Sequence, residues 1–192
     1  VQPVERRGVD LVIALDTSTS MDAEDVTPSR LAKAKLEIGR LISNLKGDRV
    51  AIIVFAGTSH LYLPLTTDYE AALLFLNEID SNMIPTQGTV LSAAMNTALD
   101  SFTDETDKFK VMVLVSDGED HDDQAVEIAT KAAGQGLMIN TVGVGSKNLQ
   151  ECLLFQLKKL YPSEKTALHI ISDFYTPFSN KNFEHLIKHL SI

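Results

Sequence analysis

The segment LVIALDTSTS (11–20) decides the expected fold, because a fully apolar run ends directly in a run of oxygen-bearing side chains. Three further short runs are rich in Val and Ile: VAIIVF (50–55), VMVLV (111–115) and INTVGVG (139–145). Runs that are apolar throughout are typical of strands in a parallel sheet covered on both faces. Another run, SHLYLPL (59–65), alternates in polarity and contains a proline, which favours an edge strand.

Amphipathic segments lie between these runs and predict helices that cover the sheet. Their apolar residues recur at spacings of three and four. The segments with this pattern are 29–45, 69–76, 91–102, 125–132, 149–160 and 183–190, and LHIIS (168–172) is a further expected strand. We therefore expect an α/β fold, a Rossmann-like doubly wound three-layer sandwich with a mostly parallel central sheet and one antiparallel edge strand. A length of 192 residues fits a single domain over residues 1–192.

The charge of the chain is concentrated in two places. The sequence has 26 acidic and 17 basic residues, a net charge of −9, and nine of the acids lie in 16–25 and 117–123, which contain no Lys or Arg. This balance argues against a nucleic-acid partner, which requires a basic surface. The single cysteine, Cys152, excludes an internal disulfide. No apolar run approaches the length needed to span a bilayer, and the start at Val1 predicts a longer parent protein or a processed product.

Both acidic segments directly follow predicted strands. Ligands of doubly wound sheets bind beyond the carboxyl ends of the strands, at the point where the strand order reverses. If the two strands are neighbours there, Asp16 and Asp117 approach each other, and two close carboxylates repel unless a cation or a proton lies between them. In an extended turn, Ser18 and Ser20 would point to the same side as Asp16, and such an oxygen-rich set suits a hard divalent cation. The alternative for this segment alone is an ordinary turn and helix N-cap.

A third polar element precedes the helix expected from about residue 90. Gln87-Gly88-Thr89 would place the Thr89 hydroxyl at the same end of the sheet. Taken alone, Thr89 is equally well explained as a helix N-cap. Three oxygen-rich elements at strand ends or helix starts favour a shared cation site.

Together these residues resemble the von Willebrand factor A domain family. DTSTS (16–20) matches its Asp-x-Ser-x-Ser motif, Thr89 its separate threonine and SDGED (116–120) its second-aspartate loop, which make up the metal-ion-dependent adhesion site. Within the family the chain is similar to the bacterial Bat (aerotolerance) group. The stretches that carry this likeness are RRGVDLVIALDTSTSM (6–21), AEDVTPSRLAKAK (23–35), GDRVAIIVFAG (47–57), LPLTTDY (63–69) and SDGEDHDD (116–123).

The resemblance implies a role for each of five residues. Ser18 and Ser20 would coordinate the metal through their hydroxyls, Thr89 directly or through water, and Asp16 and Asp117 mainly through bridging water. The implied ion is Mg²⁺, with Mn²⁺ or Ca²⁺ as alternatives. An open coordination position would accept a carboxylate from a protein partner, so that binding of the partner requires the metal.

The Bat likeness also implies a cellular setting. Relatives in that group carry this domain between membrane-spanning helices and are associated with MoxR-type AAA+ ATPases, so other von Willebrand factor A proteins and such an ATPase are the implied partners. The expected location is a bacterial inner membrane, through segments outside this chain, with the domain on the periplasmic side. One departure is that the Gly- and Pro-rich insertion usual in the group after the position of Ser146 is absent here.

Other functional classes fit the sequence less well. A Mg²⁺-dependent phosphotransferase of the haloacid dehalogenase kind needs a second carboxylate two residues after the first, where this chain has Ser18. No Gly-rich phosphate loop follows the first strand, and no Gly-x-Ser-x-Gly motif is present. We therefore expect no enzyme. A structural assembly domain, in which the metal only stabilises the fold, remains the alternative.

Overall fold

A five-stranded sheet forms the centre of the molecule. The computed structural model of the chain describes residues 8–103, 108–118 and 124–145. The strands are β1 (Val9–Asp16), β2 (Arg49–Phe55), β3 (Ser59–Thr66), β4 (Phe109–Ser116) and β5 (Leu137–Gly143), in the order β3-β2-β1-β4-β5. Only β3 runs antiparallel to its neighbour among these strands. The predicted mostly parallel sheet with an antiparallel edge strand is therefore confirmed, although β5 begins and ends two residues before the predicted run.

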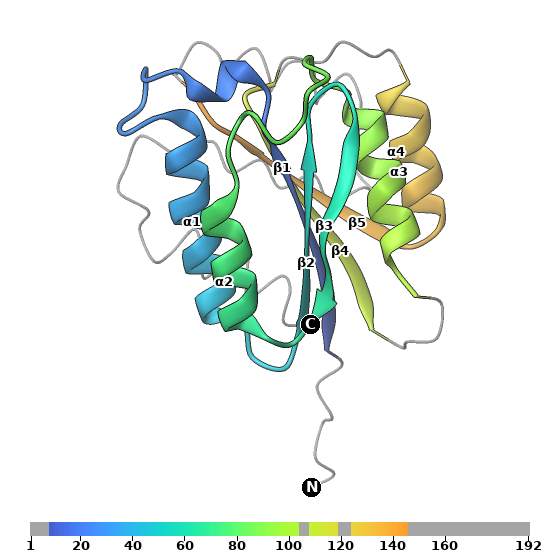
Figure 1. Cartoon of the computed structure of the whole chain (residues 1–192). Coiled ribbons are helices and arrows are strands. Elements are labelled where there is room, and N and C mark those ends of the chain that lie inside the picture. The colour runs from blue at the N-terminus through green and yellow to red at the C-terminus, as the bar shows by residue number, and fades with distance from the viewer. Residues whose placement is uncertain (1–7, 104–107, 119–123, 146–192) are drawn as a thin grey trace, which may run out of the picture.

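Helices cover both faces of this sheet, as Figure 1 shows. α1 and α2 lie on one face, and α3 and α4 lie on the other, which confirms the doubly wound three-layer α/β sandwich. Their bounds are α1 (Arg30–Asn44), α2 (Tyr69–Glu78), α3 (Leu91–Ser101) and α4 (Ala125–Gly134). The predicted elements at 149–160, 168–172 and 183–190, together with Cys152, lie outside the described residues, and a single domain over 1–192 stays a prediction.

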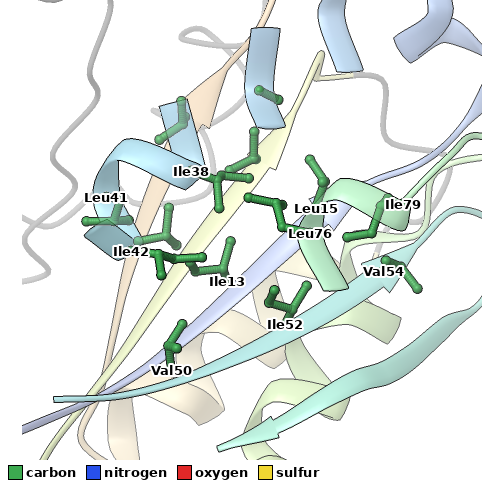
Figure 2. Packing of buried hydrophobic residues seen from close by; sticks show 14 of the residues in the cluster. Ile13, Leu15, Ile38, Leu41, Ile42, Val50, Ile52, Val54, Leu76 and Ile79 are labelled. Carbon is green, nitrogen blue, oxygen red and sulfur yellow. The ribbon is translucent and has the colours of Figure 1, made fainter. Parts of the chain in front are cut away.

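Strand β1 is buried on both sides, which explains its uninterrupted apolar sequence. Leu11, Ile13 and Leu15 point into the core beneath α1 and α2, where Figure 2 shows Ile13 and Leu15 beside side chains of the helices. Val12 and Ala14 point into the second core, beneath α3 and α4. All five side chains are fully shielded from solvent. Burial on two faces requires helices on both, so the composition of β1 and the layered architecture have the same cause.

The strand order reverses next to β1. The chain passes from β1 to β2 on one side, whereas β4 pairs with β1 on the other side, in parallel. The carboxyl ends of β1 and β4 are therefore adjacent, as expected for the two strands that lead into the acidic segments. Among the described residues, no helix has the length and apolar character to cross a membrane.

Replacement of a central β1 side chain tests this account of the core. Ile13→Ala should lower the free energy of unfolding by about 2–5 kcal/mol, because it leaves a cavity between β1 and the α1–α2 layer. Urea unfolding followed by circular dichroism measures this loss. Leu74→Ala is the control, since Leu74 is 68% exposed, and it should change the unfolding free energy by no more than about 0.5 kcal/mol. Equal losses in the two variants would contradict the assignment of the core.

Candidate metal centre

Asp16 is the last residue of β1, and its carboxylate is completely buried. Oδ1 accepts a hydrogen bond from the Ser18 backbone N–H at 2.9 Å, and Oδ2 accepts one from the Ser116 hydroxyl at 2.7 Å. Ser116 is the last residue of β4. The carboxylate is therefore held between its own turn and the neighbouring strand, which fixes its position at the carboxyl edge of the sheet.

The two serines of the first motif lie together, as the sequence predicts. Their hydroxyl oxygens are 2.9 Å apart. The prediction of an extended turn is wrong in one respect. Ser18 is extended, but the chain then forms a 3₁₀-helix over Thr19–Asp22. Met21 of this helix is fully buried and holds it against the core. The 3₁₀-helix turns the chain back, so that Ser20 can contact Ser18.

Thr89 lies just before α3 and is almost fully buried, but the alternative that it caps this helix is wrong. The structure places Val90 at the capping position, and the Val90 side chain makes no capping hydrogen bond. The loop before Thr89 is joined to the first motif by Gln87, whose Oε1 accepts a hydrogen bond from the Thr19 N–H at 3.0 Å. A side chain at Gly57, after β2, would come within 2.5 Å of the Gln87 carbonyl oxygen, so glycine there permits the close approach of this loop.

Asp117 follows β4, and its side chain is fully shielded from solvent. Gly118, with φ of 92°, turns the chain directly after it and donates from its N–H to the Ser116 hydroxyl at 3.1 Å. Oδ2 of Asp117 accepts a hydrogen bond from Arg30. Oδ1 is buried and has no hydrogen-bond partner in the part of the chain that the structure describes. An unsatisfied buried carboxylate oxygen is costly, and it calls for a ligand.

Arg30 brings a positive charge into the site, which the sequence reasoning missed. Its Nη1 lies 2.7 Å from Oδ2 of Asp117 and 3.3 Å from the Ser20 carbonyl oxygen. Its Nε and Nη2 donate to the two oxygens of Asp25 at 2.8 and 3.1 Å. The acidic segments contain no basic residue, so we expected only a cation or a proton to relieve the two carboxylates. The guanidinium, at the start of α1, corrects this expectation.

Electrostatic coupling shows that the two aspartates are close. Burial is the main cause that raises the pKa of Asp16 from its ordinary value of 3.8 to about 6. The hydrogen bonds from Ser116 and Ser18 lower this pKa and so oppose the increase. The negative charge of Asp117 adds to this increase. The hydrogen bond to Asp25 is the largest of the causes that raise the pKa of Arg30. The pKa of Asp16 therefore lies well above its ordinary value.

The donor set fits a hard divalent cation. It consists of oxygen atoms: two carboxylates and the hydroxyls of Ser18, Ser20 and Thr89. Asp16, Asp117, Asp25 and Arg30 carry a summed formal charge of −2, which one divalent cation balances. In the described ranges, His, Cys, Asp and Glu form no group of three that could hold a metal. The set of oxygen donors suits Mg²⁺, which uses one or two carboxylates and keeps several waters.

Two further acids near the first motif have side-chain partners in the structure. Oδ2 of Asp22 accepts a hydrogen bond from the Ser81 hydroxyl at 2.6 Å, and Asp25 binds Arg30. The acids at 119–123 lie outside the described residues. Asp22 therefore connects the 3₁₀-helix to the loop after α2, and Asp25 connects the segment before α1 to that helix.

The raised pKa of Asp16 predicts how pH changes the stability of the metal-free protein. Because this pKa is higher in the folded than in the unfolded chain, the stability contributed by protonated Asp16 is fully present below about pH 4 and is lost as the pH rises through about 6. The loss should reach about 3 kcal/mol. Urea unfolding at pH 4–8 in chelator would show a decline that Asp16→Asn lacks. Parallel pH profiles for the two proteins would contradict the shift.

Comparisons with known proteins identify the fold family. The family model of the von Willebrand factor type A domain matches residues 11–119. A second model, the sigma-54 factor core binding domain, matches residues 117–192, less than half of the chain. Within that second range, the described β5 pairs with β4 in the central sheet that also contains β1, and α4 packs against this sheet.

Solved structures of bacterial proteins are similar over much of the chain. An aerotolerance-related membrane protein from Bacteroides fragilis is 32% identical, with a TM-score of 0.83 over 95% of this chain and 98% of that one. The BatB protein from Bacteroides thetaiotaomicron is 45% identical, with a TM-score of 0.69 over 71% of this chain and 66% of that one. The manganese-loaded TRAP protein of Plasmodium vivax, 18% identical, shares the fold with a TM-score of 0.71 over 96% of this chain and 73% of that one.

The curated relatives are longer proteins. The chain spans 41–48% of the length of the first bacterial relatives that it matches, at 28–29% identity. The family model covers more than half of the chain, and the structure has the expected mostly parallel sheet between helical layers. The chain therefore belongs to the von Willebrand factor type A domain family.

Proposed function

We propose that this chain is a metal-dependent protein-interaction domain that binds a carboxylate of a partner protein through a divalent cation. Von Willebrand factor A domains are typically interaction domains of this kind, and they are generally not enzymes. The observation that carries the proposal is the buried Oδ1 of Asp117, which has no partner among the described residues and lies in a site that also holds buried Asp16. A divalent cation would satisfy this oxygen and offset the negative charge of both carboxylates.

Five residues would hold the ion: Asp16, Ser18, Ser20, Thr89 and Asp117. Mg²⁺ is the proposed ion, with Mn²⁺ as the next candidate; the Plasmodium vivax structure that shares this fold is described as manganese-loaded. Ser116 and the Ser18 N–H orient the Asp16 carboxylate, and Arg30 orients that of Asp117. When bound, the cation supplies an electrophilic position that an acidic side chain of a partner can occupy.

The setting that we propose follows from similarity. The Bacteroides fragilis protein is named as an aerotolerance-related membrane protein, and the Bacteroides thetaiotaomicron protein is BatB. We propose a bacterial parent that is held in the inner membrane by segments outside this chain, with this domain on the periplasmic side. Its proposed partners are other von Willebrand factor A proteins and a complex that includes a MoxR-type AAA+ ATPase.

A structural role for the metal is the second candidate. Ser18, Ser20, Asp16 and Asp117 connect the ends of β1 and β4 to α1, so a cation at this position would also stabilise the fold. The two functions differ in one measurable respect. A purely structural ion would change the melting temperature without changing the binding of a partner.

Removal of either aspartate should abolish metal binding and leave the fold intact. Asp117→Ala and Asp16→Ala should each weaken Mg²⁺ binding by about 100-fold or more in isothermal titration calorimetry, because each removes one of the two buried carboxylates. Asp100→Ala is the control, since Asp100 is an exposed acid near the far end of α3. Its affinity should equal that of the unmodified chain. Unchanged Mg²⁺ affinity in Asp117→Ala would reject the site.

Capture of partners tests the interaction itself. The chain and its Asp117→Ala variant are used as bait in a bacterial membrane extract with Mg²⁺ or with EDTA. We expect a partner to be retained only by the unmodified chain with Mg²⁺. If EDTA lowers the melting temperature but leaves the retained proteins unchanged, the structural role of the metal is the correct one.

A further inference from the structure

Arg30 occupies an unusual position for a basic residue, because it lies buried among the groups that would hold a divalent cation. Its side chain is 10% exposed, and the guanidinium contacts Asp117 and the Ser20 carbonyl on one side and Asp25 on the other. Between Gly8 and Lys33 it is the only basic residue in the sequence. A planar guanidinium with several fixed donors can hold two carboxylates at once, which the single ammonium of a lysine does less well.

The contact with Arg30 limits how Asp117 can bind a cation. Oδ2 is taken by Nη1 at 2.7 Å, so only Oδ1 is left without a donor among the described residues. Each oxygen of Asp16 also accepts a hydrogen bond from the chain. Each carboxylate oxygen keeps a second lone pair, so a hydrogen bond alone does not exclude a cation. An ion held by both oxygens of Asp117 would, however, lie beside the positive guanidinium at Oδ2, which repels it. Asp117 therefore favours binding through Oδ1 or through water.

Divalent cations differ in how often they bind both oxygens of one carboxylate. Ca²⁺ takes six to eight oxygen ligands at 2.3–2.6 Å and often binds both oxygens of an Asp or Glu. Mg²⁺ takes six ligands at 2.0–2.1 Å, uses one or two carboxylates and keeps several waters. A site in which a guanidinium disfavours two-oxygen binding by one of its carboxylates thus suits the smaller ion.

We propose that Arg30 is a specificity-determining residue of this centre, which favours Mg²⁺ over Ca²⁺ because it prevents Asp117 from binding an ion with both oxygens. The inference rests on the proposed function, since it requires that the site binds a divalent cation. Asp25 has a supporting role: it holds Nε and Nη2, so the guanidinium cannot swing away from Asp117 when a cation approaches. Asp25, in the loop before α1, thereby affects the selectivity of the site through Arg30.

Calorimetric titration of the whole chain with Mg²⁺ and, separately, with Ca²⁺ tests the proposal. The ratio of the two dissociation constants should favour Mg²⁺ in the unmodified chain. In Arg30→Met this preference should fall by about tenfold or more, mainly because Ca²⁺ binds more tightly once Oδ2 of Asp117 is free. Arg40→Met is the matched control: Arg40 is on the same helix, contacts Glu37 and is 62% exposed, so the ratio should not change.

Several outcomes separate selectivity from simpler roles. If Arg30→Met strengthens the binding of both ions by the same factor, Arg30 acts only through its charge and the proposal is wrong. If it lowers the melting temperature in EDTA but leaves the ratio unchanged, Arg30 is only structural and the proposal is again wrong. If the unmodified chain binds neither ion, the proposed function fails together with this inference, whereas an unchanged ratio overturns the inference alone.

Loss of folding in Arg30→Met would not prevent the test. Arg30→Lys keeps the charge but cannot hold Asp25 and Asp117 with a planar fork, so Oδ2 of Asp117 is less firmly occupied. We expect its preference for Mg²⁺ to fall by about threefold, and an unchanged ratio in this folded variant would overturn the proposal.

Discussion

The burial of two carboxylates at neighbouring strand ends is the constraint on which the rest of this site depends. Asp16 and Asp117 follow β1 and β4, which lie side by side in the sheet, and both are shielded from water. A buried charge must be matched by hydrogen bonds or by an opposite charge. The chain supplies Ser116 and the Ser18 N–H to one carboxylate and Arg30 to the other, yet one oxygen of Asp117 stays unmatched. This oxygen is the position at which the proposed cation would bind.

The layered fold makes this constraint possible. β1 is apolar on both faces, so it takes the centre of the sheet, with β2 on one side and β4 on the other. Packing of this kind leaves the strand little freedom to move, and the position of Asp16 follows from it. The serine hydroxyls lie in a loop. Gln87 accepts a hydrogen bond from Thr19 of this loop, and the 3₁₀-helix over Thr19–Asp22 brings Ser20 to Ser18. A rigid sheet thus positions the carboxylates, and short loops position the hydroxyls.

Local sequence patterns predicted the sheet and the four described α-helices, because each depends on spacing within a short stretch. The metal-binding role of Asp16, Ser18, Ser20, Thr89 and Asp117 stays a prediction. Local patterns could not predict Arg30, whose partner Asp117 lies 87 residues away and becomes its neighbour only when β4 pairs with β1. The role of Gln87 was missed for the same reason, since its contact with Thr19 spans 68 residues. A clue to Arg30 was present: it is the first basic residue after an acidic run that leads into a helix.

The mixture of ligands argues for recognition of a partner rather than for storage of an ion. A site built to retain a cation surrounds it with carboxylates that use both oxygens. Here the chain offers two carboxylates, each already engaged in hydrogen bonds, and otherwise hydroxyls, which carry no charge. A cation held in this way has few anionic ligands from its own chain. In the function that we propose, an acidic side chain of another protein would add the missing anionic ligand, so the same feature that weakens metal retention would strengthen binding of the partner.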